Sequence, residues 1–301
     1  MPKDPLIDPA LGLDLIATRT LSRQAASVAV IVPAHNEEAT IEEVVEQAHR
    51  GLSILDVDGE VIVCASACTD QTASKAAKAG ATVVLTGAGK GVAISAGLER
   101  TTGDIICLID GDLQYFGEPP LSALLVAPIL NGLADACISD LYWRPLYPQL
   151  WLYGFFAPVA GLLFPELLPK VGSTPWSGQR AAVRSLWPSK LPDDFTVDLA
   201  LLLHWNAHAR RLRPVLADDW INPQRPKPDL MRKELDVLIA AAIKDHRLSE
   251  DDVPHLNTWY TQVHTAMAEY SPDHDDPHTF EQQILRQARE LLPSLSHPVR
   301  S

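Results

Sequence analysis

The sequence predicts an α/β protein with a mostly parallel β-sheet flanked by helices and a helical extension at its C-terminal end. Short apolar runs, which are typical of buried parallel strands, alternate with segments of helical periodicity in the first half of the chain. Beyond about residue 230, only helical periodicity continues. We therefore expect an N-terminal segment 1–24, a sheet domain 25–230 and a helical extension 231–301.

Four apolar runs predict four strands in the first half of the sheet domain. They are Val28–Pro33, Glu60–Cys64, Ala81–Leu85 and Ile105–Ile109. Helices are expected after the first three, over 40–48, in a short Ala/Lys-rich segment, and over 92–100. We expect Pro33 to end its strand, because proline cannot continue a central ladder. The loops that follow these strands should meet, since the carboxyl ends of parallel strands lie at one edge of a sheet.

The second half contains fewer recognisable elements. Helices are expected over Val197–Arg210, Leu230–Asp245, Asn257–Tyr270 and Thr279–Leu292, with a strand over Pro214–Ala217. Residues 249–252 have the composition of a capped helix start. We expect the C-terminal helices to pack on the sheet domain or to mediate dimerisation.

Composition limits the function classes. The chain has 301 residues, of which 47% are hydrophobic and 21% charged, as in folded soluble proteins. A formal net charge of −13 argues against a nucleic-acid partner, whose backbone needs basic neutralisation. The start of the chain lacks a signal-peptide pattern, so we expect cytoplasmic localisation. Four cysteines without paired spacing are expected to be small buried residues in a reducing compartment: Cys64, Cys68, Cys107 and Cys137.

The most apolar segment is Leu150–Phe164. It spans 15 residues without a charge, which is short of the ~20 residues of a membrane-spanning helix. Pro158 interrupts it. We expect no transmembrane segment and favour core packing or a dimer contact; a hydrophobic binding groove or a peripheral membrane contact is the alternative.

The loop Asp110-Gly111-Asp112 carries the strongest chemical signal. Two carboxylates follow directly on a buried strand, and the glycine between them lets a ligand come close. Hard oxygen donors at this position suit Mg²⁺ or Mn²⁺ carrying a diphosphate. The alternative is a solvated turn, because Asp-Gly-Asp is ordinary turn chemistry.

Two other loops offer complementary groups. Asn36 and Glu37 provide hydrogen bonds for a sugar or a base, and Lys90 provides a positive charge near a phosphate. The glycine loop 87–91 precedes a helix and has the composition of a phosphate cradle. It lacks the P-loop spacing, and no GxGxxG follows the first strand, which argues against a P-loop or dinucleotide-binding protein.

The order of these motifs resembles a nucleotide-sugar glycosyltransferase of the GT-A fold. The motifs are Pro-Ala-His-Asn-Glu-Glu from Pro33, Ala-Cys-Thr-Asp-Gln-Thr from Ala67, Gly-Lys-Gly from Gly89 and Asp-Gly-Asp from Asp110. Four later motifs, at 144–146, 163–167, 176–180 and 195–199, resemble the glucosyl-3-phosphoglycerate synthase and mannosyl-3-phosphoglycerate synthase group of retaining glycosyltransferases. The resemblance covers roughly residues 25–245.

The resemblance implies a role for each matching residue. Nucleotide and donor contacts are implied for Pro33, Ala34, His35, Asn36, Glu37, Ser66, Lys90, Asp110, Gly111 and Asp112. Acceptor contacts are implied for Arg144, Ser177, Gly178 and Gln179. Metal ligation is implied for Asp112 most directly, for Asp110, and at the position of Asn222. Catalytic groups are implied at Lys90, Asp112, Gln179 and Asp198, and Asp198 matches an acidic residue that binds hydroxyls of the donor sugar.

The implied protein is a retaining, Mg²⁺- or Mn²⁺-dependent enzyme that moves a sugar from a nucleoside diphosphate sugar to a small-molecule acceptor. Residues 25–115 would form its nucleotide-binding half and 116–230 its acceptor half. UDP-Glc or UDP-GlcNAc is the expected donor, and a homodimer the expected assembly. Attack from the front face of the sugar is expected, with the metal and Lys90 stabilising the departing phosphate.

Three departures from the group's pattern leave alternatives open. Ala65 and Ser66 replace two acids, one of which commonly contacts the nucleobase. Asn222 stands where the group has a metal-binding histidine, and Gln179 where it has glutamate. The first departure suggests altered base recognition, and the changes at 222 and 179 suggest a different acceptor, in specialised metabolism. Ala65, Gln179 and Asn222 leave room for a sugar-nucleotide-binding module without transfer activity. A nucleotidyltransferase is the other alternative; the absence of a glycine-rich loop with Arg and Lys after the first strand counts against it.

Overall fold

The structure, a computed structural model, describes residues 26–114, 116–140, 150–172, 174–217 and 229–295. The chain forms two compact units. The first comprises residues 1–140 and 175–225, and the second 141–174 and 226–301. The domain limits at 24/25 and 230/231 stay predictions drawn from the sequence.

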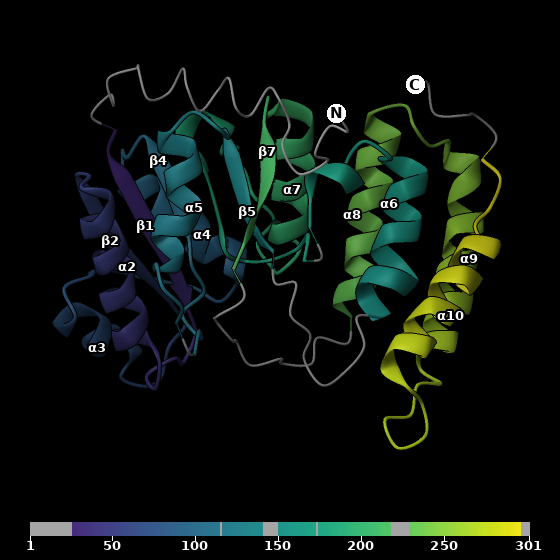
Figure 1. Cartoon of the computed structure of the whole chain (residues 1–301), viewed down its shortest axis with the longest axis horizontal. Helices are drawn as coiled ribbons and strands as arrows, with labels where there is room; N and C mark the ends of the chain where they lie inside the picture. Colours follow the sequence, from purple (N-terminus) through teal and green to yellow (C-terminus); the bar gives the residue numbers. More distant parts are fainter. Residues whose placement is uncertain (1–25, 115, 141–149, 173, 218–228, 296–301) are drawn as a thin grey trace, which may run out of the picture. The chain divides into compact units, whose positions relative to one another are not determined.

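The first unit is built on a seven-stranded sheet with the order β3-β2-β1-β4-β6-β5-β7 (Figure 1). Its strands are β1 (Val28–Ala34), β2 (Gly59–Ser66), β3 (Thr82–Thr86), β4 (Ile105–Leu108), β5 (Ala136–Asp140), β6 (Arg180–Val183) and β7 (Leu212–Leu216). β6 runs antiparallel to β4 and β5, and all other neighbours are parallel. The predicted α/β class with a mostly parallel sheet is confirmed.

The four strands predicted in the first half are β1 to β4. The expectation that Pro33 ends the first strand is wrong, because β1 continues to Ala34 and Pro33 pairs with Cys64 of β2. The carbonyls of Ile31 and Pro33 both face β4, where they accept from the backbone N–H groups of residues 109 and 111. The missing N–H of Pro33 therefore points beyond Leu108, the last residue of β4, and removes no bond from the ladder.

Two central strands and one α-helix of the first unit were not predicted. β6 has four residues and begins with a buried arginine, so its apolar run is only three residues long. β5 ends in Ser-Asp and is equally short of a distinct pattern. The helix α5 (Leu121–Leu130) is apolar on nearly all sides and therefore lacks the 3.6-residue periodicity of a surface helix.

The remaining helices of the first unit position the loops at the carboxyl edge of the sheet. They are α2 (Ile41–Leu55), α3 (Thr72–Lys78), α4 (Lys90–Arg100), the 3₁₀ turn η3 (Arg184–Leu186) and α7 (Val197–His208). α4 packs closely on β1 and β2: a Cβ at Gly97 would lie 2.6 Å from Ile31 Cγ2 and 3.1 Å from Cys64 Sγ. This close packing fixes where Lys90, the first residue of α4, lies relative to the carboxyl edge of the sheet.

The second unit is helical in its described residues. Its elements are the π-helix η1 (Trp151–Phe156), α6 (Ala157–Leu163), η2 (Leu168–Lys170), α8 (Leu230–Lys244), η4 (Glu250–Asp252), α9 (Val253–Met267) and α10 (Pro277–Glu290). The predicted C-terminal helices are present. The helix expected from Asn257 begins earlier, at Val253, after a turn in which Ser249 Oγ accepts from the Asp251 N–H.

The apolar segment 150–164 is packed inside the second unit. Phe155 and Phe156 are each 1% exposed. The Phe155 ring lies 6.4 Å from Trp259 and 6.0 Å from Tyr260 of α9. These two residues are therefore packed in a core, as the favoured interpretation predicts. None of the helices in the described part of the chain combines the length and the apolar character needed to cross a membrane.

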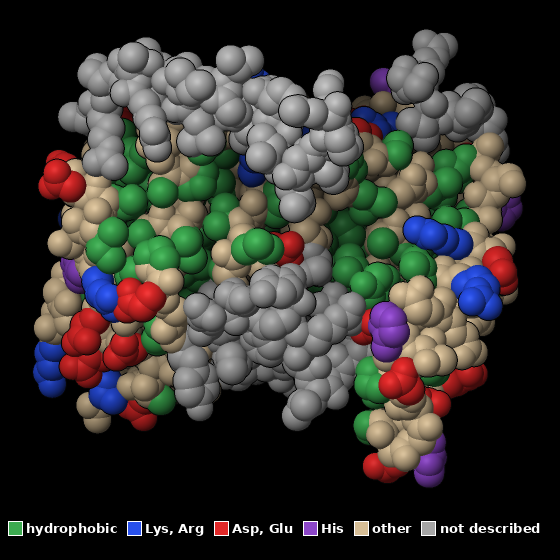
Figure 2. Space-filling view, in the orientation of Figure 1, with side chains coloured by type: hydrophobic (Ala, Val, Ile, Leu, Met, Phe, Trp, Pro, Cys, Tyr) green, Lys and Arg blue, Asp and Glu red, His purple; other side chains and the backbone are tan. Residues whose placement is uncertain are grey.

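Acidic and basic side chains lie next to one another over α2 and α3 on the face drawn in Figure 2. Glu42, Glu43 and Glu46 of α2 are exposed. Three of the four cysteines, Cys64, Cys107 and Cys137, are buried, and Cys68 is partly exposed. Burial raises the pKa of the Cys64 thiol to about 12, so this thiol is unreactive at neutral pH.

Candidate active site

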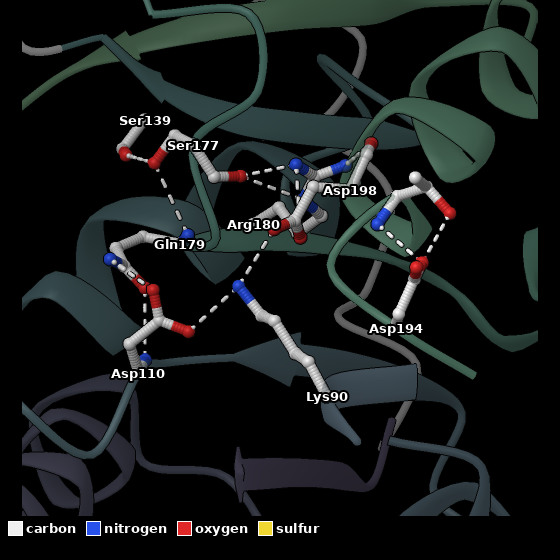
Figure 3. Close-up of polar contacts among 9 residues, drawn as sticks. Lys90, Asp110, Ser139, Ser177, Gln179, Arg180, Asp194 and Asp198 are labelled. Carbon is white, nitrogen blue, oxygen red and sulfur yellow. Dashed lines mark hydrogen bonds and ion pairs between the residues drawn. The ribbon is translucent and has the colours of Figure 1, made fainter. Parts of the chain in front are cut away.

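A cluster of charged side chains lies at the carboxyl end of β4, next to the start of β6. Leu108 of β4 pairs with Arg180 of β6 in antiparallel register, so Asp110 and Gln179, which flank that pair, are brought side by side. In Figure 3 the side chains of Lys90, Asp110, Gln179 and Asp198 converge from the first turns of α4 and α7 and from these strand ends. Four residues predicted from the sequence as catalytic or binding groups therefore meet in one place.

Lys90 is the centre of this cluster. Its Nζ lies 3.0 Å from Asp110 Oδ1 and 2.8 Å from Asp198 Oδ2. Burial alone would lower the pKa of Lys90, but the negative charges of Asp110 and Asp198, with their hydrogen bonds, raise it. Lys90 is therefore a permanent positive charge at neutral pH, held between two carboxylates.

Gln179 fixes Asp110 from the other side. The Asp110 backbone N–H donates to Gln179 Oε1 at 2.9 Å, and Gln179 Nε2 donates to Asp110 Oδ2 at 3.1 Å. Gln179 is itself 1% exposed, and its backbone N–H donates to Ser177 Oγ, which bonds to Ser139 Oγ at 2.7 Å. A neutral amide at this position can satisfy both Asp110 groups; a glutamate would set two carboxylates against each other.

Arg180 is a member of the cluster that the sequence analysis did not assign. It is fully buried, its Nη1 donates to the Asp198 carbonyl at 2.8 Å, and its Nη2 lies 3.5 Å from Asp198 Oδ1. Its Nε donates to the Ser177 carbonyl at 2.9 Å, and its guanidinium lies 5.6 Å from the Trp205 ring centre. Burial lowers the pKa of Arg180, and the charges of Asp198 and Asp110 oppose that effect. Asp198 is thus held by two cations.

Gly178 leaves room for the ion pair. A Cβ on this residue would lie 2.2 Å from Asp110 Oδ2 and 2.7 Å from Lys90 Nζ. Any side chain would occupy the space in which the two charged groups meet. The family resemblance implies an acceptor contact for Gly178; the geometry adds a steric reason for glycine at this position.

The N-terminus of α4 is bonded to the chain that precedes α7. The N–H groups of Gly91 and Val92 donate to the Asp193 carbonyl at 2.9 and 3.3 Å. A Cβ on Gly91 would lie 1.6 Å from the Pro192 carbonyl oxygen. Two of the N–H groups that a phosphate cradle would use therefore already have a partner, which argues against that interpretation of the glycine loop.

The loops after β1 and β2 are joined by hydrogen bonds. Thr69 N–H donates to Asn36 Oδ1 at 2.8 Å, and Glu37 N–H donates to Thr72 Oγ1 at 2.8 Å. Asp70 accepts from the N–H groups of Glu38 and Thr72 and from Thr72 Oγ1. The slight burial of Asp70 would raise its pKa, but these hydrogen bonds lower it. These hydrogen bonds join the two loops, residues 35–40 and 67–72, into one rim at the carboxyl ends of β1 and β2.

His35 and Ser66 connect this rim to the strand ends. His35 Nδ1 lies 2.6 Å from the Ser66 carbonyl oxygen, and Ser66 Oγ donates to the Gly87 carbonyl at 2.8 Å. His35 and Asn36 are exposed, whereas Ser66 and Glu37 are buried. Pro33 and Ala34 are the last two residues of β1.

The Asp110-Gly111-Asp112 loop is hydrogen-bonded to β1 and to this rim through its middle residue, Gly111. Gly111 N–H donates to the Pro33 carbonyl at 3.3 Å, and Thr40 Oγ1 donates to the Gly111 carbonyl at 2.7 Å. The loop therefore connects this rim to the charged cluster, of which Asp110 is a member. Within the described ranges, no set of three or more His, Cys, Asp or Glu side chains is arranged to hold a metal ion. Arg144 and Asn222, predicted for acceptor and metal binding, lie outside the described residues.

Comparison with known proteins identifies relatives of this chain. Residues 29–145 match the family model described as glycosyl transferase family 2. The glucosyl-3-phosphoglycerate synthase of Mycobacterium tuberculosis (strain ATCC 25618 / H37Rv) is 35% identical over 206 residues, which cover 60% of this chain and 61% of that protein. The low-salt glycan biosynthesis hexosyltransferase Agl6 of Haloferax volcanii is 38% identical over 118 residues, 38% of this chain and 28% of that protein. The matched region thus spans about three fifths of the synthases' length.

Solved structures extend the similarity to the second half of the chain. The M. tuberculosis synthase in complex with Mn²⁺, UDP and glucosyl-3-phosphoglycerate superposes with a TM-score of 0.60 and 28% identity, over 80% of this chain and 86% of that one. The same enzyme with Mg²⁺ and UDP gives a TM-score of 0.59 and 27% identity, over 79% and 85%. The GT-A fold and the resemblance to this glycosyltransferase group, both predicted from the motifs, are confirmed.

Proposed function

We propose that this chain, whose residues 29–145 match glycosyl transferase family 2, transfers a hexose from a UDP-sugar to a small-molecule acceptor, with retention of anomeric configuration and with Mg²⁺ or Mn²⁺. The observation that carries the proposal is Lys90, held 3.0 and 2.8 Å from Asp110 and Asp198 beside an Asp-Gly-Asp loop at the carboxyl edge of the sheet. Ligands bind at that edge in open α/β sheets. UDP-Glc or UDP-GlcNAc is the proposed donor.

Asp112 is the proposed direct metal ligand. Asp110 and Asp112 offer the hard carboxylate oxygens that Mg²⁺ and Mn²⁺ prefer, on a loop fixed at Gly111. Both oxygens of Asp110 already contact donors, Lys90 Nζ at 3.0 Å and Gln179 Nε2 at 3.1 Å. Because both oxygens of Asp110 are engaged in this way, we propose Asp112 as the more direct ligand, with Asp110 adding its charge nearby. The role of Asn222 as a further ligand stays a prediction.

Sugar transfer at this site would use a bound cation and two of the chain's own residues, Lys90 and Asp198. A divalent cation bound here would stabilise the negative charge that develops on the departing diphosphate. Lys90 adds a second, fixed positive charge, because its raised pKa keeps it protonated. Asp198 is held by Lys90 and Arg180 and is proposed to orient hydroxyls of the sugar.

Retention by front-face attack fits this arrangement. The charge of Asp198 is shared by two cations, which makes it a poor nucleophile for a double displacement. We therefore propose that the acceptor hydroxyl attacks on the side from which UDP departs, and that the departing phosphate oxygen takes the proton. An α-linked product from an α-linked donor, seen in the anomeric region of the proton NMR spectrum, supports this; a β-linked product contradicts it.

The acceptor is proposed to lie near Ser177, Gly178 and Gln179, with Arg144 as a further contact. Crystal structures of the M. tuberculosis synthase contain phosphoglyceric acid, so 3-phosphoglycerate is the first acceptor to test. The neutral amide of Gln179, where the group has glutamate, and the asparagine at 222 support a different acceptor of specialised metabolism.

The decisive experiment measures UDP release by the full-length chain. Each UDP-sugar is incubated with Mn²⁺ and a panel of small hydroxylated acceptors that includes 3-phosphoglycerate, and products are identified by mass spectrometry. Asp112→Asn should lower the rate by about 100-fold or more, the scale expected for loss of a group that stabilises transition-state charge. Asp58→Asn is the matched control, because Asp58 is exposed and precedes β2 at the opposite edge of the sheet.

Three results would contradict the proposal. Full activity of Asp112→Asn would remove the metal loop from the mechanism. Tight binding of UDP-sugar without transfer to any acceptor would favour the binding module. Formation of UDP-sugar from UTP and a sugar 1-phosphate would favour the nucleotidyltransferase.

A further inference from the structure

We propose that Arg180 is a positioning residue for sugar transfer, which keeps Asp198 in place while Lys90 serves the departing diphosphate. The inference rests on the proposed function, in which Asp198 orients hydroxyls of the donor sugar. Arg180 is the first residue of β6 and is fully buried, so it acts through its neighbours and does not touch a ligand itself.

Arg180 holds Asp198 by its backbone and by its side chain. Nη1 donates to the Asp198 carbonyl at 2.8 Å, and Nη2 lies 3.5 Å from Asp198 Oδ1. Among the described residues, this Oδ1 is buried without a hydrogen bond, so the guanidinium charge compensates an oxygen that has lost its water. Because Asp198 is the second residue of α7, these contacts also fix the first turn of that helix.

The same guanidinium holds the segment that contains Ser177. Nε donates to the Ser177 carbonyl at 2.9 Å, and Nη2 donates to the same oxygen. Figure 3 shows Arg180 between Ser177 and Asp198. Ser177 belongs to the segment proposed to contact the acceptor, so one side chain joins this segment to the residue proposed to orient the donor sugar.

The position of Lys90 explains why Asp198 needs a second cation. Lys90 Nζ is already shared between Asp110, at 3.0 Å, and Asp198, at 2.8 Å. A departing diphosphate would be a third anion beside this one charge and would weaken its attraction to Asp198. Arg180 is buried, so its charge stays with Asp198 and keeps the carboxylate compensated.

Arginine is the residue type that this arrangement requires. Its planar fork donates in several fixed directions, here to two carbonyls while its charge faces a carboxylate; lysine provides a compact charge on a flexible stem. The Trp205 ring of α7 lies 5.6 Å from the guanidinium carbon of Arg180 and adds a cation–π contact. Arg180 is therefore held against α7 at two residues, Asp198 and Trp205.

Arg184 provides a matched control, because it makes similar bonds away from the site. Its Nε donates to the Gly103 carbonyl at 2.7 Å and its Nη2 to the Thr101 carbonyl at 2.6 Å. It follows Val183, which pairs with Ile105 at the start of β4, so it lies at the opposite edge of the sheet. Arg184→Met removes a buried fork from two carbonyls without changing the charged cluster.

The test is a double-mutant cycle on the full-length chain. Arg180→Met, Asp198→Asn and the double variant are assayed with Mn²⁺ and the donor and acceptor that release UDP fastest in the panel described above. Arg180→Met should lower kcat/KM by about tenfold or more, the scale expected for a misplaced catalytic group. In the Asp198→Asn background the same change should cause no further loss, because the group that it positions is already removed.

Two further measurements separate positioning from a general loss of structure. Calorimetry with UDP and Mn²⁺ should give the wild-type dissociation constant for Arg180→Met, because Arg180 is not a nucleotide contact. Arg180→Lys keeps a positive charge near Asp198 and should recover part of kcat/KM. If thermal unfolding shows that Arg180→Met does not fold, Arg180→Lys replaces it in the cycle. Arg184→Met should lower the melting temperature and keep the wild-type kcat/KM.

The inference is overturned if Arg180→Met keeps the wild-type kcat/KM, if the losses of the two single variants multiply in the double variant, or if UDP binding falls as much as transfer. In each of these cases wild-type transfer that is lost in Asp112→Asn would leave the proposed function standing. Absence of transfer by the wild type to any acceptor would end both.

Discussion

At the scale of single residues, the cluster depends on how closely charged groups approach one another. Lys90 is within 3.0 Å of Asp110 and 2.8 Å of Asp198, and the backbone of residue 178 passes directly beside the first of these pairs. The space is sufficient only while residue 178 lacks a side chain. A methyl group there tests whether the geometry of this ion pair matters for catalysis.

Gly178→Ala is expected to lower kcat by at least tenfold, because the new methyl group displaces Asp110 Oδ2 or Lys90 Nζ, which lie 2.2 and 2.7 Å from its position. Overpacking of this kind costs about 1–3 kcal/mol of stability. Steady-state kinetics and thermal unfolding separate the two effects. Gly161→Ala in α6 is the matched control, since its nearest neighbour is the flexible Leu168 Cδ1 at 3.3 Å. Equal kcat for Gly178→Ala and the wild type would show that the ion pair can move without loss of function.

Sequence motifs were sufficient to predict Lys90, Asp110, Gln179 and Asp198 as site residues, and the structure brings them together. Arg180 was not predicted as a site residue, although it is fully buried against Asp198. A single arginine at the start of a short apolar strand carries no pattern of its own. Its role depends on the antiparallel placement of β6, which local sequence does not encode.

At the scale of elements, Asp70 is one of the groups that join the loops after β1 and β2. It accepts from Glu38 N–H of the first loop at 3.1 Å and from Thr72 N–H, at the start of α3, at 3.0 Å. These bonds favour the ionised form, which explains the direction in which the pKa of Asp70 moves.

Asp70→Asn is expected to lower the stability at neutral pH, by about 1 kcal/mol for the weakened hydrogen bonds. Because the pKa of Asp70 is lower in the folded state, its contribution is complete above the ordinary aspartate value of about 3.9 and is lost as the pH falls through the folded value. The difference in stability between wild type and variant should therefore be constant from about pH 5 to 7 and shrink below about pH 4. Urea unfolding across this range measures it.

Asp58→Asn provides the baseline for that series, since Asp58 is exposed and its side chain lies outside the rim. A difference for Asp70→Asn that does not change between pH 3 and 7 would contradict the assigned role of the carboxylate.

Element prediction succeeded where one face of an element is apolar and failed where it is not. α2 buries Ile41, Val44, Val45 and Ala48 at helical spacing and was expected from that spacing. α5 is apolar nearly all round, because it packs between the sheet strands and α2, and so shows no period. The short strands β5 and β6 are stable only through their neighbours, which is information that a four- or five-residue window does not contain.

At the scale of the whole molecule, ligand binding should be visible as added stability. A ligand that binds only the native state stabilises it by mass action, by about 2.7 kcal/mol at one hundred times its dissociation constant. We expect UDP with Mn²⁺ to raise the melting temperature more than UDP alone or Mn²⁺ alone, because in the proposed site the cation would join the diphosphate to the Asp-Gly-Asp loop.

Addition of EDTA should remove the metal-dependent part of this increase. Asp112→Asn should show only the smaller, metal-independent shift, whereas Asp58→Asn should behave as the wild type. The same shift for UDP with and without metal in the wild type would place the diphosphate away from the carboxylates. Differential scanning fluorimetry of the full-length chain is sufficient for all these measurements.

The order of strands has a consequence for how the protein is made on the ribosome. β4 lies between β1 and β6, and β5 lies between β6 and β7. Both β6 and β7 come later in the chain than β4 and β5. During synthesis the edge of β4 therefore stays open until residues 180–183 have left the exit tunnel, and an open strand edge is a template for aggregation. A fragment cut at residue 145, the limit of the matched family segment, would keep that edge exposed permanently. A fragment made for expression should therefore extend beyond β6 instead of ending at the boundary of the family model.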